Sequence, residues 1–193
     1  FFPWLENLPF KTIQTAIDYA VDDDTVIVKD GEYSETVEIK NKELTFGSMM
    51  ILNGDISHIS NTIIKGGFGF RQDHDLASSN ADTSSIIQGF TIEGKGMTVG
   101  SNSPVIKNLI IRDNDNATAL EVIGWDGMKP VKIFDSKFDN NERLSNDGGA
   151  ISSWNGNIYI ENCEFINNRA PYGGAIALKG GKLTVKKSLF IKN

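Results

Sequence analysis

The sequence predicts an all-β chain that folds as a β-solenoid, with an amphipathic helix at its N-terminal end. The first observation is composition, since the 193 residues include 23 Ile, 18 Asn and 19 Gly. Isoleucine favours strands, whereas asparagine and glycine favour turns, so short strands should alternate with turns. The second observation is a sequence repeat of about 25 residues. The third is apolar-polar alternation inside each copy, which is the period of a half-buried strand.

The repeat is clearest in the C-terminal half. Gly-Gly-Ala-Ile occurs at 148–151 and 173–176, and Phe-x-x-Asn occurs at 138–141, 165–168 and 190–193. Pairs of apolar residues five positions apart recur in the same phase, beginning at Ile87, Ile106, Ile133, Ile160 and Val185. A unit of this length cannot bury its apolar face alone, so successive units must stack as parallel sheets with strands about 4.8 Å apart. A β-sandwich is the alternative, but its antiparallel hairpins would not produce copies of a sequence motif at one regular spacing.

The helix is predicted at residues 11–21, where the apolar positions 13, 16, 17, 20 and 21 lie on one helical face. Three aspartates then end it, and a buried strand follows at 25–28. We expect residues 1–24 to cap the open end of the core and residues 25–193 to form the coils of one domain. Because the repeat pattern persists to Asn193, we expect the chain to be truncated there, to continue into further coils, or to meet another copy of itself.

Charge and cysteine content exclude several classes of protein. The net charge of −6 and the pI near 4.9 argue against a nucleic-acid partner, which would need a basic face. The single Cys163 allows neither an internal disulfide nor a cysteine metal site, and the two histidines lack metal-ligand spacing. No apolar run approaches the roughly 20 residues of a membrane span, and no signal peptide opens the chain. These properties suit a soluble exported protein.

The N-terminal half resembles a known superfamily. Residues 10–18, 24–28 and 31–33 resemble the N-terminal cap and first coil of the right-handed parallel β-helix, or pectin-lyase-like, superfamily. Residues 62–67 and 85–92 resemble its next coils in exported bacterial proteins. The Gly-Gly-Ala-Ile and Phe-x-x-Asn motifs are similar to those of the polymorphic outer-membrane proteins of chlamydiae. These resemblances imply a right-handed parallel β-helix that is secreted or held at the cell surface, but no particular activity, since this fold hosts many functions.

The catalytic motifs of that superfamily are not found in the sequence. Polygalacturonase-like hydrolases carry Asn-Thr-Asp, Asp-Asp, Gly-His-Gly and Arg-Ile-Lys, and only an Asp-Asp run occurs here, at 22–24. The methylesterase motif Gln-Asp-Thr-Leu is matched only in its first two residues, at 72–73. No catalytic residue is therefore assigned. A divergent polysaccharide lyase or hydrolase stays open, and it would require Arg112, Asp139 and Asp147 to form one cleft.

Two acidic loops about one coil apart form a candidate calcium site, because calcium prefers oxygen ligands. Its residues would be Asp113, Asp115, Asp139 and Asp147. The simpler interpretation is a turn region with surface ion pairs, such as one between Arg112 and Asp139, which share a repeat position. We expect no other cofactor.

Aromatic residues form a candidate ligand strip. Trp125 and Trp154 each begin a glycine-containing turn in the same part of their units, Lys179 replaces them in the next unit, and Tyr172 extends the row. Exposed rings on adjacent coils would stack against a polysaccharide or another cell-surface ligand. The alternative is that each tryptophan packs over its own loop.

The bends of the repeat carry asparagines for which we predict a structural role. Asn108 and Asn162 share one bend position and Asn140 and Asn167 another, so their side-chain amides should hydrogen-bond from coil to coil as a ladder. The stretch 67–83 has no repeat pattern, and a loop of this length is either functional or loosely ordered.

Together these patterns predict an extracellular or cell-surface module that binds carbohydrate or another surface ligand, as an adhesion protein does, without evident catalysis. A divergent lyase or hydrolase and a purely structural spacer remain the alternatives.

Overall fold

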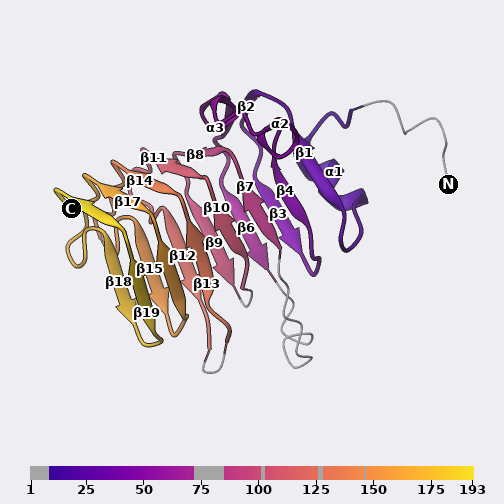
Figure 1. Cartoon of the computed structure of the whole chain (residues 1–193). Coiled ribbons are helices and arrows are strands. Elements are labelled where there is room, and N and C mark those ends of the chain that lie inside the picture. Colours follow the sequence, from indigo (N-terminus) through magenta and orange to yellow (C-terminus); the bar gives the residue numbers. More distant parts are fainter. Residues whose placement is uncertain (1–8, 72–84, 101–102, 126–127, 146) are drawn as a thin grey trace.

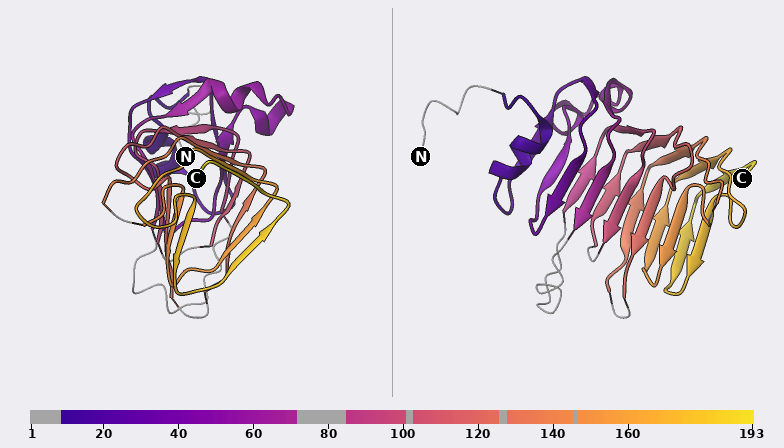
Figure 2. Two further views of the ribbon diagram at one scale, coloured as in Figure 1. Left: turned by 90° about the vertical axis from the view of Figure 1, so that its left-hand side faces the viewer. Right: turned by 180° about the vertical axis from the view of Figure 1, so that it is seen from behind.

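The computed structural model describes residues 9–71, 85–100, 103–125, 128–145 and 147–193, and it shows a parallel β-solenoid (Figure 1). The strands of these residues form three parallel sheets, which the chain visits in the same order in every coil. Each strand therefore pairs with the strand three places further along the chain. Figure 2 shows the coils stacked around a shared interior, with the helix α1 (Ile13–Tyr19) at one end and the C-terminus at the other. The predicted all-β solenoid is confirmed.

Sheet A contains β1 (Thr25–Val28), β4 (Thr45–Ser48), β7 (Ile86–Gln88), β10 (Val105–Lys107), β13 (Val131–Phe134), β16 (Ile158–Glu161) and β19 (Leu183–Lys186). Sheet B contains β2 (Gly31–Tyr33), β5 (Thr62–Ile64), β8 (Thr91–Glu93), β11 (Ile110–Arg112), β14 (Lys137–Asp139), β17 (Glu164–Ile166) and β20 (Leu189–Ile191). Sheet C contains β3 (Val37–Lys40), β6 (Phe68–Arg71), β9 (Met97–Gly100), β12 (Leu120–Ile123), β15 (Ile151–Trp154) and β18 (Ile176–Lys179).

The apolar rows predicted from the repeat form the core. In sheet A the residues that begin the apolar pairs, from Ile87 to Val185, are partners in register, and Ile106, Ile133 and Ile160 are fully buried. In sheet B the residues that end the pairs form a second row, in which phenylalanine rings stack. The centroids of Phe138 and Phe165 are 4.9 Å apart. In each pair, the first residue therefore faces the core from sheet A and the second faces it from sheet B.

The N-terminal helix packs against β1 and β3 at the end of the solenoid and buries Ile13 and Ile17. The helix is shorter than predicted. It ends at Tyr19 because Ala20 is extended, with φ −63° and ψ 147°. Val21, predicted to lie on the apolar face, is consequently exposed.

Charged side chains hold both ends of α1 on the first coil. The Glu35 carboxylate accepts hydrogen bonds from the backbone N–H groups of Ile13 and Gln14, both at 2.9 Å. The Lys42 ammonium donates to the carbonyl of Ile17 at 2.8 Å, at the other end of the helix. A carboxylate at the N-terminus and a cation at the C-terminus both complement the helix dipole.

Two short helices, α2 (Met50–Asn53) and α3 (Ser57–Asn61), interrupt the coil between β4 and β5 and have no counterpart in the repeat pattern. The backbone carbonyl of Ile59 in α3 accepts a hydrogen bond of 2.7 Å from Thr91 Oγ1 in β8. His58 Nδ1 lies 2.5 Å from Asp30 Oδ1 at the bend before β2. These contacts hold α3 beside sheet B.

The stretch 67–83, predicted to be a loop without repeat pattern, begins with a strand. Residues 68–71 are β6, which pairs with β3 and β9 in sheet C. Phe68 and Phe70 point into the core while Gly69 lies between them, so these residues do alternate. The rest of the predicted loop, except Gly67, lies outside the described residues.

Candidate ligand-binding surfaces

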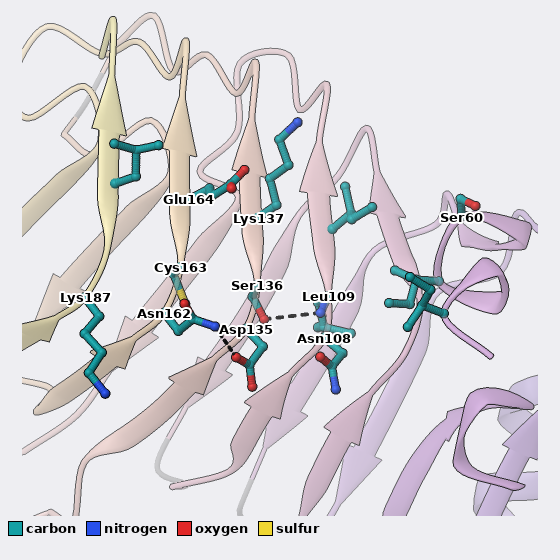
Figure 3. A pocket seen from close by; sticks show the side chains of 14 residues that line it. Ser60, Asn108, Leu109, Asp135, Ser136, Lys137, Asn162, Cys163, Glu164 and Lys187 are labelled. Carbon is teal, nitrogen blue, oxygen red and sulfur yellow. Dashed lines mark hydrogen bonds between the residues drawn. The ribbon is translucent and has the colours of Figure 1, made fainter. Parts of the chain in front are cut away.

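A groove with a volume of about 480 Å³ runs along the corner between sheets A and B (Figure 3). It follows the bends that join β10 to β11, β13 to β14, β16 to β17 and β19 to β20, and α3 lies at one end. The bend residues share a left-handed backbone, with φ from 47° to 57°, and they are Asn108, Asp135, Asn162 and Lys187. Asparagine and aspartate tolerate this conformation better than other residues with side chains.

Most polar side chains of this groove already have a partner within the protein. Asn162 Nδ2 donates to Asp135 Oδ1 at 2.5 Å (Figure 3). The Ser136 hydroxyl accepts from the backbone N–H of Leu109 at 3.2 Å. Lys137 forms an ion pair with Asp139 on the same strand, and Lys187 forms one with Glu161 at the end of β16. The groove therefore offers few polar groups that are ready to bind a ligand.

The thiol of Cys163 lies at the base of this groove but is buried. Burial raises the pKa of Cys163 to about 11. The thiolate is the nucleophilic form of cysteine, so this residue is protonated and unreactive at neutral pH.

The predicted asparagine ladder is only partly formed by the predicted residues. Asn140 and Asn167 occupy left-handed bends, as do Asn108 and Asn162, and the Asn140 amide donates to Asp113 Oδ1 at 2.7 Å on the exposed surface. Left-handed geometry turns these side chains outward, so the interior ladder uses other residues.

The buried ladder lies one residue later. Asn114 Nδ2 donates to Asn141 Oδ1 at 2.6 Å, Asn141 Nδ2 to Asn168 Oδ1 at 2.8 Å, and Asn168 Nδ2 to Asn193 Oδ1 at 2.8 Å. Each acceptor oxygen also receives the backbone N–H of the preceding asparagine in the ladder. The signal was in the sequence, because the third copy of Phe-x-x-Asn has Lys192 where the other copies have Asn140 and Asn167. Only the last asparagine is present in all three copies.

The four carboxylates of the candidate calcium site are not brought together. Asp113 lies 3.6 Å from Arg112 Nε, Asp139 lies 2.7 Å from Lys137 Nζ, and Asp147 forms an ion pair with Lys179. Asp115 forms a backbone bridge with Glu142. Across the described ranges, no group of three His, Cys, Asp or Glu side chains is close enough to hold a metal ion.

The cleft required by the lyase or hydrolase hypothesis is not assembled either. Arg112 and Asp139 are partners in register, as their shared repeat position predicts. However, the Arg112 guanidinium donates to Glu93 Oε2 at 3.0 and 3.2 Å. Since Asp139 and Asp147 pair with lysines, these groups serve three separate ion pairs.

The candidate aromatic strip lies where the strands of sheet C end, at their C-terminal residues. Trp154 ends β15, and its register partners are Ile123 in β12 and Lys179 in β18. Trp154 and Ile123 are 48% and 47% exposed. Trp125, which is 39% exposed, lies two residues beyond β12, next to Gly124, whose N–H donates to the Trp154 carbonyl at 2.9 Å. The two tryptophans are thus on adjoining coils but are not register partners.

Lys179 connects the strip to the loop before β15. Its ammonium lies 4.4 Å from the centre of the Trp154 ring and also pairs with Asp147. Tyr172 is 73% exposed and bridges through its backbone to Asp147. A cation over the ring restrains the orientation of Trp154 while leaving much of it accessible.

Comparison with known protein families relates part of the chain to a repeat. Residues 162–179 match the family model of the Chlamydia polymorphic membrane protein repeat. This segment extends from the bend before β17 to the end of β18, and it contains Phe165, the ladder residue Asn168 and the second Gly-Gly-Ala-Ile motif. No curated protein and no solved structure matches the chain. Within the part of the chain that the structure describes, no helix is long and apolar enough to cross a membrane.

Proposed function

We propose that this chain belongs to an exported bacterial protein and that its solenoid binds a polysaccharide at the cell surface. The match of residues 162–179 to a repeat of chlamydial membrane proteins supports a place at the bacterial surface. A rigid solenoid suits this role because it holds side chains from successive coils in one fixed row.

One observation carries the proposal. Trp154 is half exposed on a rigid strand, with exposed Ile123 beside it in register and Trp125 on the adjoining coil. Large apolar side chains gathered at a surface mark binding sites, whereas single ones are common and need no explanation. Indole rings present a flat apolar face of the kind that packs against the apolar face of a sugar ring. The binding surface is therefore the end of sheet C.

The groove between sheets A and B supports ligand binding less well. Asp135 and Asn162 at its bends, and both of its lysines, already bond to other groups of the same protein. A ligand there would have to replace these interactions, whereas a ligand at the end of sheet C would cover apolar surface that is exposed to water.

A panel of polysaccharides tests the proposal, with binding measured by calorimetry and cleavage measured as new reducing or unsaturated ends. We expect at least one polysaccharide to bind without cleavage, and Trp154→Ala to weaken that binding at least tenfold. Tyr19→Ala is the matched control, because Tyr19 is an exposed aromatic residue on α1. Binding that survives both Trp154→Ala and Trp125→Ala would overturn the proposal. Cleavage would favour the lyase or hydrolase alternative, and no binding at all would favour the spacer.

A further inference from the structure

The outer face of sheet A carries a second feature, which lies on a different sheet from the tryptophans. Over its last four strands, alternation points two rows of side chains outward. One row contains Val105, Lys132, Tyr159 and Thr184. The other contains Lys107, Phe134, Glu161 and Lys186. Three of these eight residues are lysines and one is acidic.

The single carboxylate of these rows is already engaged. Glu161 Oε2 accepts a hydrogen bond of 2.6 Å from the Tyr159 hydroxyl, and Lys187 Nζ lies 3.4 Å from Glu161 Oε1. Asp135, at the bend that follows Phe134, accepts from the Asn162 amide. Among the residues that the structure describes, no carboxylate lies within 4.0 Å of the ammonium groups of Lys107, Lys132 or Lys186, although Glu161 is the register partner of Lys186 and its charge acts on that lysine.

Two aromatic rings lie between these lysines. The centroids of Phe134 and Tyr159 are 5.8 Å apart, and Lys186 Nζ lies 5.2 Å from the centre of the Tyr159 ring. Hydrogen bonding to Tyr159 raises the pKa of Lys186, so this residue keeps its charge at all physiological pH values. The face therefore combines fixed positive charges with half-buried rings.

This local charge has the opposite sign to that of the whole protein. The chain carries a net charge of −6, so a general attraction for polyanions cannot arise from its overall charge. Lys107 and Lys132 lie on adjoining coils, about 4.8 Å apart along the solenoid, and Lys186 lies two coils beyond Lys132. With only one carboxylate in the two rows, these lysines leave a local excess of positive charge, which would instead attract a polyanion lying along the axis.

We propose that the outer face of sheet A over β10, β13, β16 and β19 binds a sulfated polysaccharide, through Lys107, Lys132 and Lys186. Lysine ammonium groups bind anions as compact point charges. A sulfated glycan carries more charges per sugar ring than a glycan with carboxylates alone, so it would gain more from these lysines. The rings of Phe134 and Tyr159 supply apolar contact between the charges.

The test uses heparin as the probe and a triple variant, Lys107→Glu, Lys132→Glu and Lys186→Glu. The control triple variant is Lys11→Glu, Lys29→Glu and Lys95→Glu, which changes exposed lysines elsewhere and alters the net charge equally. Circular dichroism and thermal unfolding confirm that both variants are folded. We expect the first variant to lose at least tenfold in heparin affinity and the control to retain it. Wild-type binding should weaken steeply between 50 and 300 mM salt, by about tenfold or more, because salt screens surface charges.

Several results would overturn the proposal. They are no heparin binding by the wild type, an equal loss in both triple variants, or binding of polygalacturonate or polyglutamate as tight as that of heparin. Polygalacturonate and polyglutamate carry carboxylates and no sulfate groups. Tight binding of polyglutamate would point to an acidic polypeptide as the ligand. Trp154→Ala separates this inference from the proposed function, since it should leave heparin binding unchanged. The two proposals can therefore fail independently.

Discussion

The side-chain amide nitrogen of Asn141 donates to the side-chain oxygen of Asn168 across 2.8 Å in the interior of the solenoid. The same amide also donates to the backbone carbonyl of Ile111 at 3.0 Å, while its oxygen accepts from the Asn114 amide at 2.6 Å. One side chain thus satisfies polar groups on the coils before and after it. Buried polar groups without partners are costly, so this residue stabilises three coils together.

Replacement of Asn141 should be among the most destabilising changes at a polar position. Asn141→Ala leaves the Ile111 carbonyl and the Asn114 amide without these partners, and we expect a loss of about 2–4 kcal/mol in the free energy of unfolding. Urea denaturation measures this loss. Asn140→Gly is the control, because Asn140 is exposed and has φ 54°, which glycine adopts readily. Equal losses in the two variants would contradict a special role for the buried ladder.

Burial explains which parts of the fold could be predicted from sequence. The apolar rows must be in phase because a shift of one residue would turn every core side chain outward. Ile133 therefore aligns with Ile160, and Phe138 with Phe165, as the repeat predicts. The helices α2 and α3 obey no such constraint, because none of their residues is buried in the core.

The candidate site was harder to predict, for a related reason. Trp125 and Trp154 appear equivalent because both begin a Trp-x-Gly sequence. In the structure the core residues Leu120 and Ile151 set the register of β12 and β15, and this aligns Ile123 with Trp154. Exposed side chains do not set strand register, so a motif built on them can shift by two residues. The ladder was misplaced for a similar reason: Asn140 and Asn141 are adjacent in the sequence, but Asn140 is exposed and Asn141 is buried.

Removal of the Glu35 carboxylate should loosen the N-terminal cap. Glu35→Ala removes the acceptor for the first backbone N–H groups of α1, and we expect a loss of about 1–2 kcal/mol. Hydrogen exchange should show faster exchange at Ile13 and Gln14, with little change in the central coils. Glu32→Ala is the control, because Glu32 forms an exposed ion pair with Lys65. Unchanged exchange at Ile13 would contradict the capping role.

Substitution of Lys187 by asparagine should stabilise the protein. Lys187 has φ 47°, and the same bend in the three preceding coils carries Asn108, Asp135 and Asn162. Lysine in the left-handed region costs about 1 kcal/mol, and asparagine recovers part of it. The exposed ion pair with Glu161 contributes little, so we expect a gain of about 0.5 kcal/mol in urea denaturation. Lys187→Ala is the control, because it removes the same ion pair but leaves an unfavourable residue in the left-handed conformation of the bend. A gain of the same size with alanine would show that the bend conformation is not the cause.

The buried thiol of Cys163 should make stability fall at alkaline pH. Burial raises its pKa to about 11, whereas an unfolded cysteine titrates near 8.5. Below pH 8.5 the thiol is protonated in both states, and its contribution is fully present. As the pH rises toward 11, the unfolded chain releases the proton but the folded chain does not, so unfolding is favoured by on the order of 2 kcal/mol. Urea denaturation at pH 7.5 and pH 10.5 measures the fall in the wild type, and Cys163→Ala should show a smaller one. Iodoacetamide should likewise modify the native protein at pH 8 far more slowly than the urea-unfolded chain. Rapid modification of the native thiol, or an equal fall in stability in the alanine variant, would show that Cys163 is accessible to solvent rather than sealed beneath the bends of sheets A and B.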